Sequence, residues 1–114
     1  MTAGERIREL RALMRRLGEA CPGTRVAELV GVSPSVVSRW TSGEVTPRRR
    51  SMEALCVLHR VARRAVDGHA DGKKILATLL RRPGLARLGL QGFAIAAGLG
   101  WAISSASTVG KERA

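Results

Sequence analysis

Apolar residues recur along this chain at helical spacing almost from end to end. No alternation typical of a β-strand continues beyond a few residues, whereas intervals of three and four are common. The first apolar stripe, opposite a face rich in arginine, consists of Ile7, Leu10, Leu13, Met14 and Leu17. Gly18 and the Cys21-Pro22-Gly23 cluster predict the end of this helix. The pattern predicts an all-α protein.

Local capping signals predict two short helices next. Thr24 stands where an N-cap residue belongs, with a hydroxyl that can accept from an unpaired backbone amide. A short helix should run from there to about residue 30, because Gly31 suits the left-handed turn that often ends a helix.

The second of the two helices has the stronger signals. Ser33 is a good N-cap residue, and Pro34 is tolerated at the first helical position because its missing N–H would be unpaired there anyway. The helix is expected over residues 34–42 and should stop at Gly43. Two helices joined through residues 31–33 predict a tight helix-turn-helix.

The remaining pattern predicts three further helices. Thr46 and Pro47 repeat the cap-then-proline signal and should open a fourth helix. Its expected core positions are Met52, Leu55, Leu58, Ala62 and Val66. Residues 67–72 (DGHADG) predict a loop, residues 73–82 a short helix, and residues 85–105 a longer apolar helix after the break at Pro83. We therefore expect a compact four-helix domain over residues 1–66 and a C-terminal helical extension over residues 73–105.

Composition adds a strong electrostatic bias. The 114 residues carry a formal net charge of +11, and arginine far outnumbers lysine. Such an excess indicates an anionic partner, either nucleic acid or an acidic membrane surface, and arginine favours phosphate and guanine edges. Cys21 and Cys56 form no CxxC pair, so neither a disulfide framework nor a zinc site is expected, and Cys56 is predicted to be a buried apolar residue. The charged N-terminus is unlike a signal peptide, which predicts a reducing, cytoplasmic compartment.

The stretch TRVAELVGVSPSVVSRWTSG resembles the helix-turn-helix of Cro- and repressor-type regulators of phages and bacteria, the lambda repressor-like superfamily. Its continuation into PRRRSMEALCVL resembles the lambdoid lysogeny activators of the same broad group. Ala27 is small where the helices should cross, and Gly31 occupies the turn. The inward positions that would fix the angle between the helices are Val26, Val30, Val32, Val37 and Trp40. The resemblance covers residues 24–58.

The resemblance implies that the helix at residues 34–42 lies in the major groove of duplex DNA. The residues expected to contact base edges are Ser35, Val36, Ser38 and Arg39, of which Arg39 should discriminate most because arginine can bind guanine through two hydrogen bonds. The residues expected to contact the DNA backbone are Thr24, Arg25, Ser33, Thr41, Ser42, Arg48, Arg49 and Arg50. Three arginines at a helix start oppose the helix dipole, and a bound phosphate would relieve that conflict.

These observations predict a sequence-specific regulator of transcription, most simply a repressor, that binds double-stranded DNA as a homodimer in the nucleoid. No cofactor or metal is expected. An enzyme is disfavoured, because His59 and His69 are the only histidines and show no catalytic pattern, and because the acids are not paired and no glycine loop suits a phosphate.

The C-terminal third leaves alternatives open. Residues 88–110 carry no charged side chain and exceed the roughly 20 residues needed to span a bilayer. Arginines at 81, 82 and 87 would keep the preceding part in the cytoplasm if this run were an inner-membrane tether. Glycines and hydroxyl residues weaken that prediction. Residues 85–105 could equally form a dimer interface, or bind a partner protein as in an antitoxin.

Overall fold

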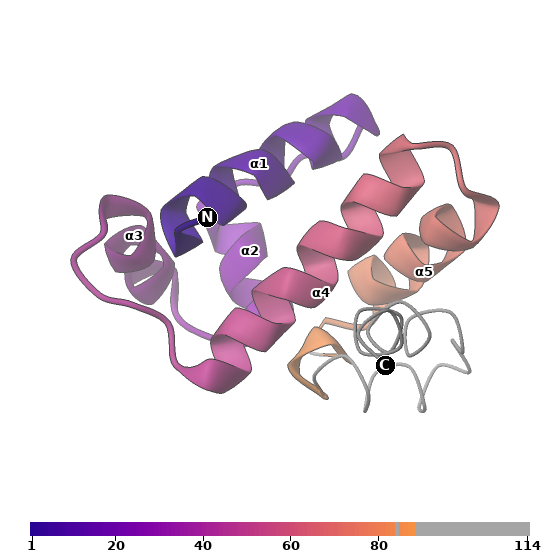
Figure 1. Cartoon of the computed structure of the whole chain (residues 1–114). Coiled ribbons are helices and arrows are strands. Elements are labelled where there is room, and N and C mark those ends of the chain that lie inside the picture. Colours follow the sequence, from indigo (N-terminus) through magenta and orange to yellow (C-terminus); the bar gives the residue numbers. More distant parts are fainter. Residues whose placement is uncertain (84, 89–114) are drawn as a thin grey trace, which may run out of the picture.

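The computed structural model describes residues 1–83 and 85–88, and in these residues the chain forms helices and no strands (Figure 1). The helices are α1 (Ala3–Arg16), α2 (Gly23–Val30), α3 (Pro34–Ser42), α4 (Arg49–Val66) and α5 (Ala70–Arg81), followed by a short 3₁₀ turn, η1 (Leu85–Leu88). The predicted all-α class is therefore confirmed. In the described residues no helix is both long and apolar enough to cross a membrane.

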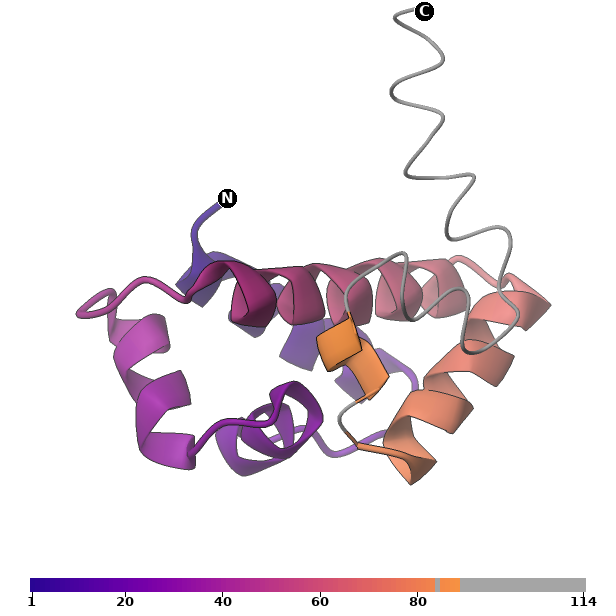
Figure 2. The same ribbon diagram turned by 90° about the horizontal axis from the view of Figure 1, so that it is seen from below.

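The long helices α1 and α4 lie against each other and form the middle of the fold. Figures 1 and 2 show α3 at one end of this pair, beside the start of α1, and α5 at the other end, against α4. The predicted stripe of α1 does face inward: Ile7, Leu10, Leu13 and Met14 are buried, and Leu17 is half-buried just beyond the helix. Thr2 caps α1 by accepting a hydrogen bond from the backbone N–H of Glu5.

The second helix begins two residues earlier than the sequence indicated. Its N-cap is Pro22, in an extended conformation, so Thr24 lies inside the first turn and does not cap the helix. At the other end, Gly31 adopts the predicted left-handed conformation, with φ of 86°. The third helix has the predicted bounds, with Ser33 at the N-cap position and Gly43 in the left-handed region.

The start of α4 was predicted wrongly. Thr46 and Pro47 belong to the connecting segment, and Arg48 is the N-cap residue of a helix that begins at Arg49. Pro47 is buried, so its ring serves packing and does not open the helix. Of the predicted core positions, Leu55, Leu58 and Ala62 are buried, whereas Met52 and Val66 are half-buried.

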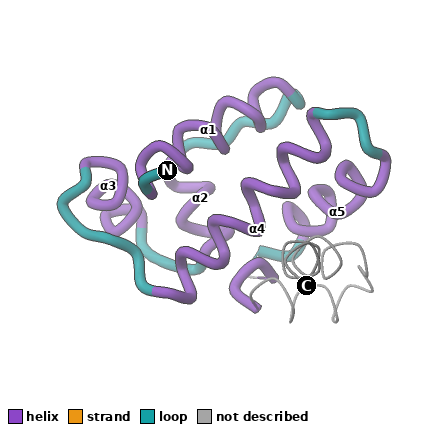
Figure 3. The backbone as a smooth tube through the Cα atoms, viewed as in Figure 1, coloured by secondary structure: helices purple, strands orange, loops and turns teal. Residues whose placement is uncertain are grey.

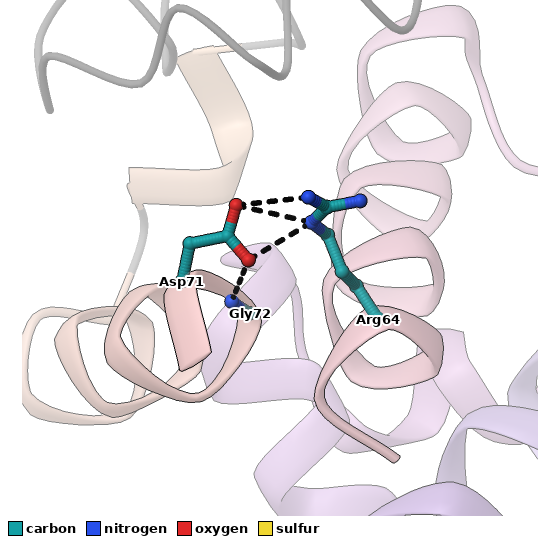
Figure 4. Close-up of polar contacts among 3 residues, drawn as sticks. All are labelled: Arg64, Asp71 and Gly72. Atoms are coloured by element: carbon teal, nitrogen blue, oxygen red, sulfur yellow. Dashed lines mark hydrogen bonds and ion pairs between the residues drawn. The ribbon is translucent and has the colours of Figure 1, made fainter. Parts of the chain in front are cut away.

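The predicted loop at residues 67–72 is shorter in the structure, because α5 begins at Ala70 and not at residue 73. Gly72, which was predicted to end the loop, lies in α5 where that helix crosses α4. A Cβ atom at Gly72 would stand 2.7 Å from the backbone nitrogen of Ala65. Arg64 on α4 binds both carboxylate oxygens of Asp71, and Asp71 also accepts from the N–H of Gly72 (Figure 4). These contacts between helices, and not local propensity, fix where α5 starts.

One continuous core joins the five α-helices of the described residues. It includes Ile75, Leu76 and Leu79 of α5 and Ala86 of η1, so the segment after α4 packs against the rest of the described chain. The connections are short, as the tube in Figure 3 shows. Only the start of the predicted helix at residues 85–105 is described, and it forms a 3₁₀ turn; the remainder of that prediction lies outside the described residues.

Two polar or sulfur-bearing residues differ from expectation. Cys56 is half-buried, whereas Cys21 is the buried cysteine, and burial raises the pKa of its thiol. His59, to which the sequence assigned no role, is half-buried and its Nε2 lies 2.9 Å from a carboxylate oxygen of Glu9 on α1. Glu9 also pairs with Arg63, so this carboxylate ties α1 to α4.

Candidate nucleic-acid interface

The α2–α3 pair is held by a small apolar contact. The N–H of Gly31 donates to the carbonyl of Ala27 at 2.7 Å, and Val32 donates to the same carbonyl at 2.9 Å, which closes the turn between the helices. The predicted inward residues Val26, Ala27, Val30, Val37 and Trp40 are buried. Val32 is only partly buried and packs at the edge of the core. The opposite face of α3 is thereby fixed outward.

The outward face of α3 carries most of the predicted base-contacting residues. Ser35, Ser38 and Arg39 are exposed, and no described residue pairs with the guanidinium of Arg39. Val36 is half-buried and packs against the core, so it is less available than the sequence indicated. The hydroxyls of Ser33 and Ser35 lie 3.1 Å apart and can exchange a hydrogen bond. This face is polar, positively charged and open.

The helix N-termini fall into two kinds. In α1 the N-cap hydroxyl and Glu5 satisfy the first turn, and in α5 Asp71 does so. In α2, α3 and α4 no side chain caps the helix and no acidic residue lies in the first turn. An uncapped first turn presents unpaired N–H groups and the positive end of the helix dipole. Three consecutive helices therefore offer sites suited to anions.

Three exposed arginines begin α4. No described residue pairs with the guanidinium groups of Arg48 and Arg50. The Nε of Arg49 donates to Glu53 at 3.1 Å, but the Arg49 side chain is 92% exposed, so solvent screens this pair strongly. The arginines add positive charge where the helix dipole is already positive. The arrangement is electrostatically unfavourable until an anion binds.

Several predicted backbone-contacting residues already have partners within the fold. Arg25 pairs with Glu28, and its Nη2 donates to the carbonyl of Leu80 at 2.7 Å, which closes the end of α5. Its guanidinium is thus committed to packing α2 against α5. The hydroxyl of Thr41 donates to the carbonyl of Val37 at 2.9 Å.

Other hydroxyls in the predicted set are better placed. Ser42 donates to the carbonyl of Arg39 at 3.1 Å and is exposed, so its oxygen can still accept or exchange this bond. Thr24 is exposed in the first turn of α2, where its own backbone N–H is available even though its hydroxyl is not a cap. Ser33 is exposed at the N-cap of α3.

Three arginines of α1 lie near the candidate interface, although the sequence indicated only that they belong to the polar face of the first helix. Arg11 and Arg15 line a hollow of about 250 Å³ with Pro22, directly at the start of α2. The Nε of Arg11 donates to the carbonyl of Cys21 at 2.9 Å, which holds the loop against α1. Arg8 lines a larger cleft of about 530 Å³ with residues at the end of α3. Helical periodicity predicts that these arginines lie on the polar face of α1. It does not predict that the start of α2 and the end of α3 lie next to that face, because this depends on the path of the chain after α1.

The described residues contain no cluster of His, Cys, Asp and Glu that could hold a metal ion. Comparisons with protein-family models, with curated proteins and with solved structures found no match to this chain.

Proposed function

We propose that this protein is a transcription regulator that binds specific double-stranded DNA, in the simplest case as a repressor. The proposal treats α2 and α3 as a helix-turn-helix whose second helix enters the major groove. It agrees with the resemblance of residues 24–58 to Cro- and repressor-type regulators, and with the net charge of +11.

The observation that carries the proposal is the difference between the helix N-termini. Helix α1 has a side-chain cap and Glu5 in its first turn, and α5 has Asp71 in its first turn, whereas α2, α3 and α4 have neither a side-chain cap nor an acid there. A protein stabilised only for folding gains by placing acids at such positions, since each is worth about 0.3–1 kcal/mol. Their absence from three successive helices, together with arginines that have no partner among the described residues, fits a surface that receives external phosphates.

Within this surface the residues have separate roles. Arg39, exposed on α3, is placed to read a guanine edge, and Ser35 and Ser38 can donate or accept beside it. Arg48 and Arg50, with Arg49, contact phosphates along one strand. Arg25 positions α2 through Leu80 and is not assigned a phosphate.

Selection of bound sites from random duplex DNA tests the proposal directly. A recurring sequence is expected, and a palindrome would show that two copies bind together, with half-sites about one helical turn apart. No retention of any duplex at low salt would rule the proposal out.

Two single substitutions then separate base contact from backbone contact. Arg39→Ala should cost about 1–3 kcal/mol on the preferred site and relax the preference at one base pair. Arg49→Ala should weaken binding to all sequences alike and reduce the slope of log affinity against log salt by about one. Equal behaviour of the two variants would contradict the assigned roles.

A further inference from the structure

A second basic surface lies at the opposite end of the molecule from the three arginines of α4. It is formed by the end of α1 and the outer face of α5, where Arg16 and Lys73 line one groove of about 450 Å³. Leu17 and Leu80, both half-buried, also line this groove, and Glu19 is the acid among its lining residues. The groove therefore combines apolar side chains with cations at its edge.

The cations of this surface are available. Arg16 and Lys73 are exposed, as are three further basic residues of α5 and its C-cap, Lys74, Arg81 and Arg82. None of the five has an ion pair or side-chain hydrogen bond with another described residue. The acid at the start of α5, Asp71, is held by Arg64 and does not neutralise them. The surface thus carries more cations than acids, next to leucine side chains that are only partly buried.

Three classes of partner fit such a surface unequally. A second copy placed by two-fold symmetry would bring the same cations against each other, which disfavours self-association here. A duplex bound at residues 48–50 would lie at the start of α4, which Figure 1 shows away from α5, and its phosphates would make no use of Leu17 or Leu80. An anionic amphiphile satisfies both halves of the surface, because its headgroup meets the cations and its hydrocarbon meets the leucines.

The sequence that follows favours a membrane as the source of that amphiphile. The described chain ends at η1, next to α2 and α4, and residues 88–110 continue without a charged side chain. Basic clusters beside a long apolar run are typical of proteins that contact anionic lipid headgroups. We propose that the groove between α1 and α5 binds the anionic lipids of a membrane surface. This proposal does not depend on DNA binding.

Flotation of the full chain with lipid vesicles tests it. The protein should bind vesicles that contain phosphatidylglycerol much more tightly than vesicles of phosphatidylcholine alone. Replacing Lys73, Lys74 and Arg81 together by Gln should weaken binding to the anionic vesicles by about a hundredfold at low salt, since each basic residue near such a surface is worth about 1 kcal/mol. The matched control replaces Arg48, Arg49 and Arg50 by Gln, removes the same charge and should leave vesicle binding within about twofold.

A thermal melt followed by circular dichroism shows whether the α5 triple variant is folded, and its melting temperature should equal that of the unchanged protein. Equal binding to the two kinds of vesicle would overturn the proposal, because the apolar run alone would then explain attachment. Equal losses for the two triple variants would also overturn it, since net charge and not this surface would be responsible. A change of sedimentation state in the α5 variant without a change in vesicle binding would assign the surface to a second copy instead.

Discussion

The two ends of α4 use arginine in opposite ways. At its C-terminal end, Arg63 pairs with Glu9 of α1 and Arg64 with Asp71 of α5, and the helix dipole favours positive charge there. At its N-terminal end, Arg48 and Arg50 have no partner among the described residues and stand against the dipole. Arginines of the first kind hold the fold together. Those of the second kind are costly to the isolated protein, which is why we assign them to a partner outside it.

The largest expected effect is the loss of DNA affinity when Arg48, Arg49 and Arg50 are all replaced by Gln. Each neutralised phosphate contributes about 0.9 to the slope of log affinity against log salt, so the slope should fall by nearly three. Fluorescence anisotropy over a salt series measures it. Replacing Arg63 by Gln is the matched control at the other end: it should lower the melting temperature and leave the slope unchanged. If the slope of log affinity against log salt were unchanged in the triple variant, the arginines at the start of α4 would not be phosphate contacts, and the proposed difference between the two ends of α4 would be wrong.

The next effect concerns packing at the C-terminal end. Gly72→Ala places a Cβ atom 2.7 Å from the nitrogen of Ala65 and 2.9 Å from the carbonyl carbon of Arg64, and backbone atoms cannot easily move away. Overpacking of this kind costs about 1–3 kcal/mol, which urea unfolding would measure. Below its unfolding transition the variant should still bind DNA normally, because α5 is far from α3.

A glycine at the other end gives the corresponding test. A Cβ atom at Gly4 would lie 2.9 Å from the carbonyl oxygen of Thr41, at the end of α3. Gly4→Ala should therefore lower the DNA affinity as well as the stability, because it displaces the helix that carries Arg39. If Gly4→Ala and Gly72→Ala affected DNA binding equally, the two ends would not be functionally separate.

These glycines also show how far the sequence could be read. The bounds of α3 were predictable because Ser33, Pro34 and Gly43 act through their own backbone geometry. The start of α5 was not, since Gly72 disfavours a helix locally and is accommodated in one by the backbone of α4. Pro47 gave the signal of a helix start but is used for burial. Capping and turn residues therefore predicted a helix boundary correctly where that boundary depends on the backbone of the same segment, and not where it depends on contact with another helix.

In the candidate site, too, features set within one helix were predictable from the sequence, and features set by distant contacts were not. The outward direction of Ser35, Ser38 and Arg39 follows from helical periodicity and was predicted. The commitment of Arg25 could not be predicted, because its acceptor is the carbonyl of Leu80, 55 positions later in the chain. Nor could the sequence show that the first turns of three helices stay uncapped, since Thr24 and Thr46 both looked like caps.

A smaller effect tests the uncapped helix starts themselves. Ser33→Asp should cap α3 and stabilise the protein by up to about 1 kcal/mol, yet weaken DNA binding about tenfold or more, because the new carboxylate would face phosphate. His69→Asp makes the same change at the N-cap of α5 and should stabilise the protein without affecting DNA. Thermal melts and anisotropy measure both. Loss of DNA affinity in both variants would point to net charge alone.

The smallest effect is a dependence of stability on acid pH at the C-terminal end of α4. Hydrogen bonds from His59 and then Arg63 hold the pKa of Glu9 below its ordinary value of 4.5, and hydrogen bonds from Arg64 lower that of Asp71 below 3.8. A lowered pKa in the folded state means that the ionised carboxylate stabilises the fold fully above the ordinary value, and that this contribution is lost as pH falls through the folded value. The urea concentration at the unfolding midpoint should therefore begin to drop below about pH 4.5. The double substitution Glu9→Gln and Asp71→Asn should make that drop less steep. It should leave the DNA affinity at neutral pH unchanged. An equally steep acid dependence in the double variant would mean that acids elsewhere in the chain set it, and that the ion pairs at this end of α4 stabilise the fold less than their geometry indicates.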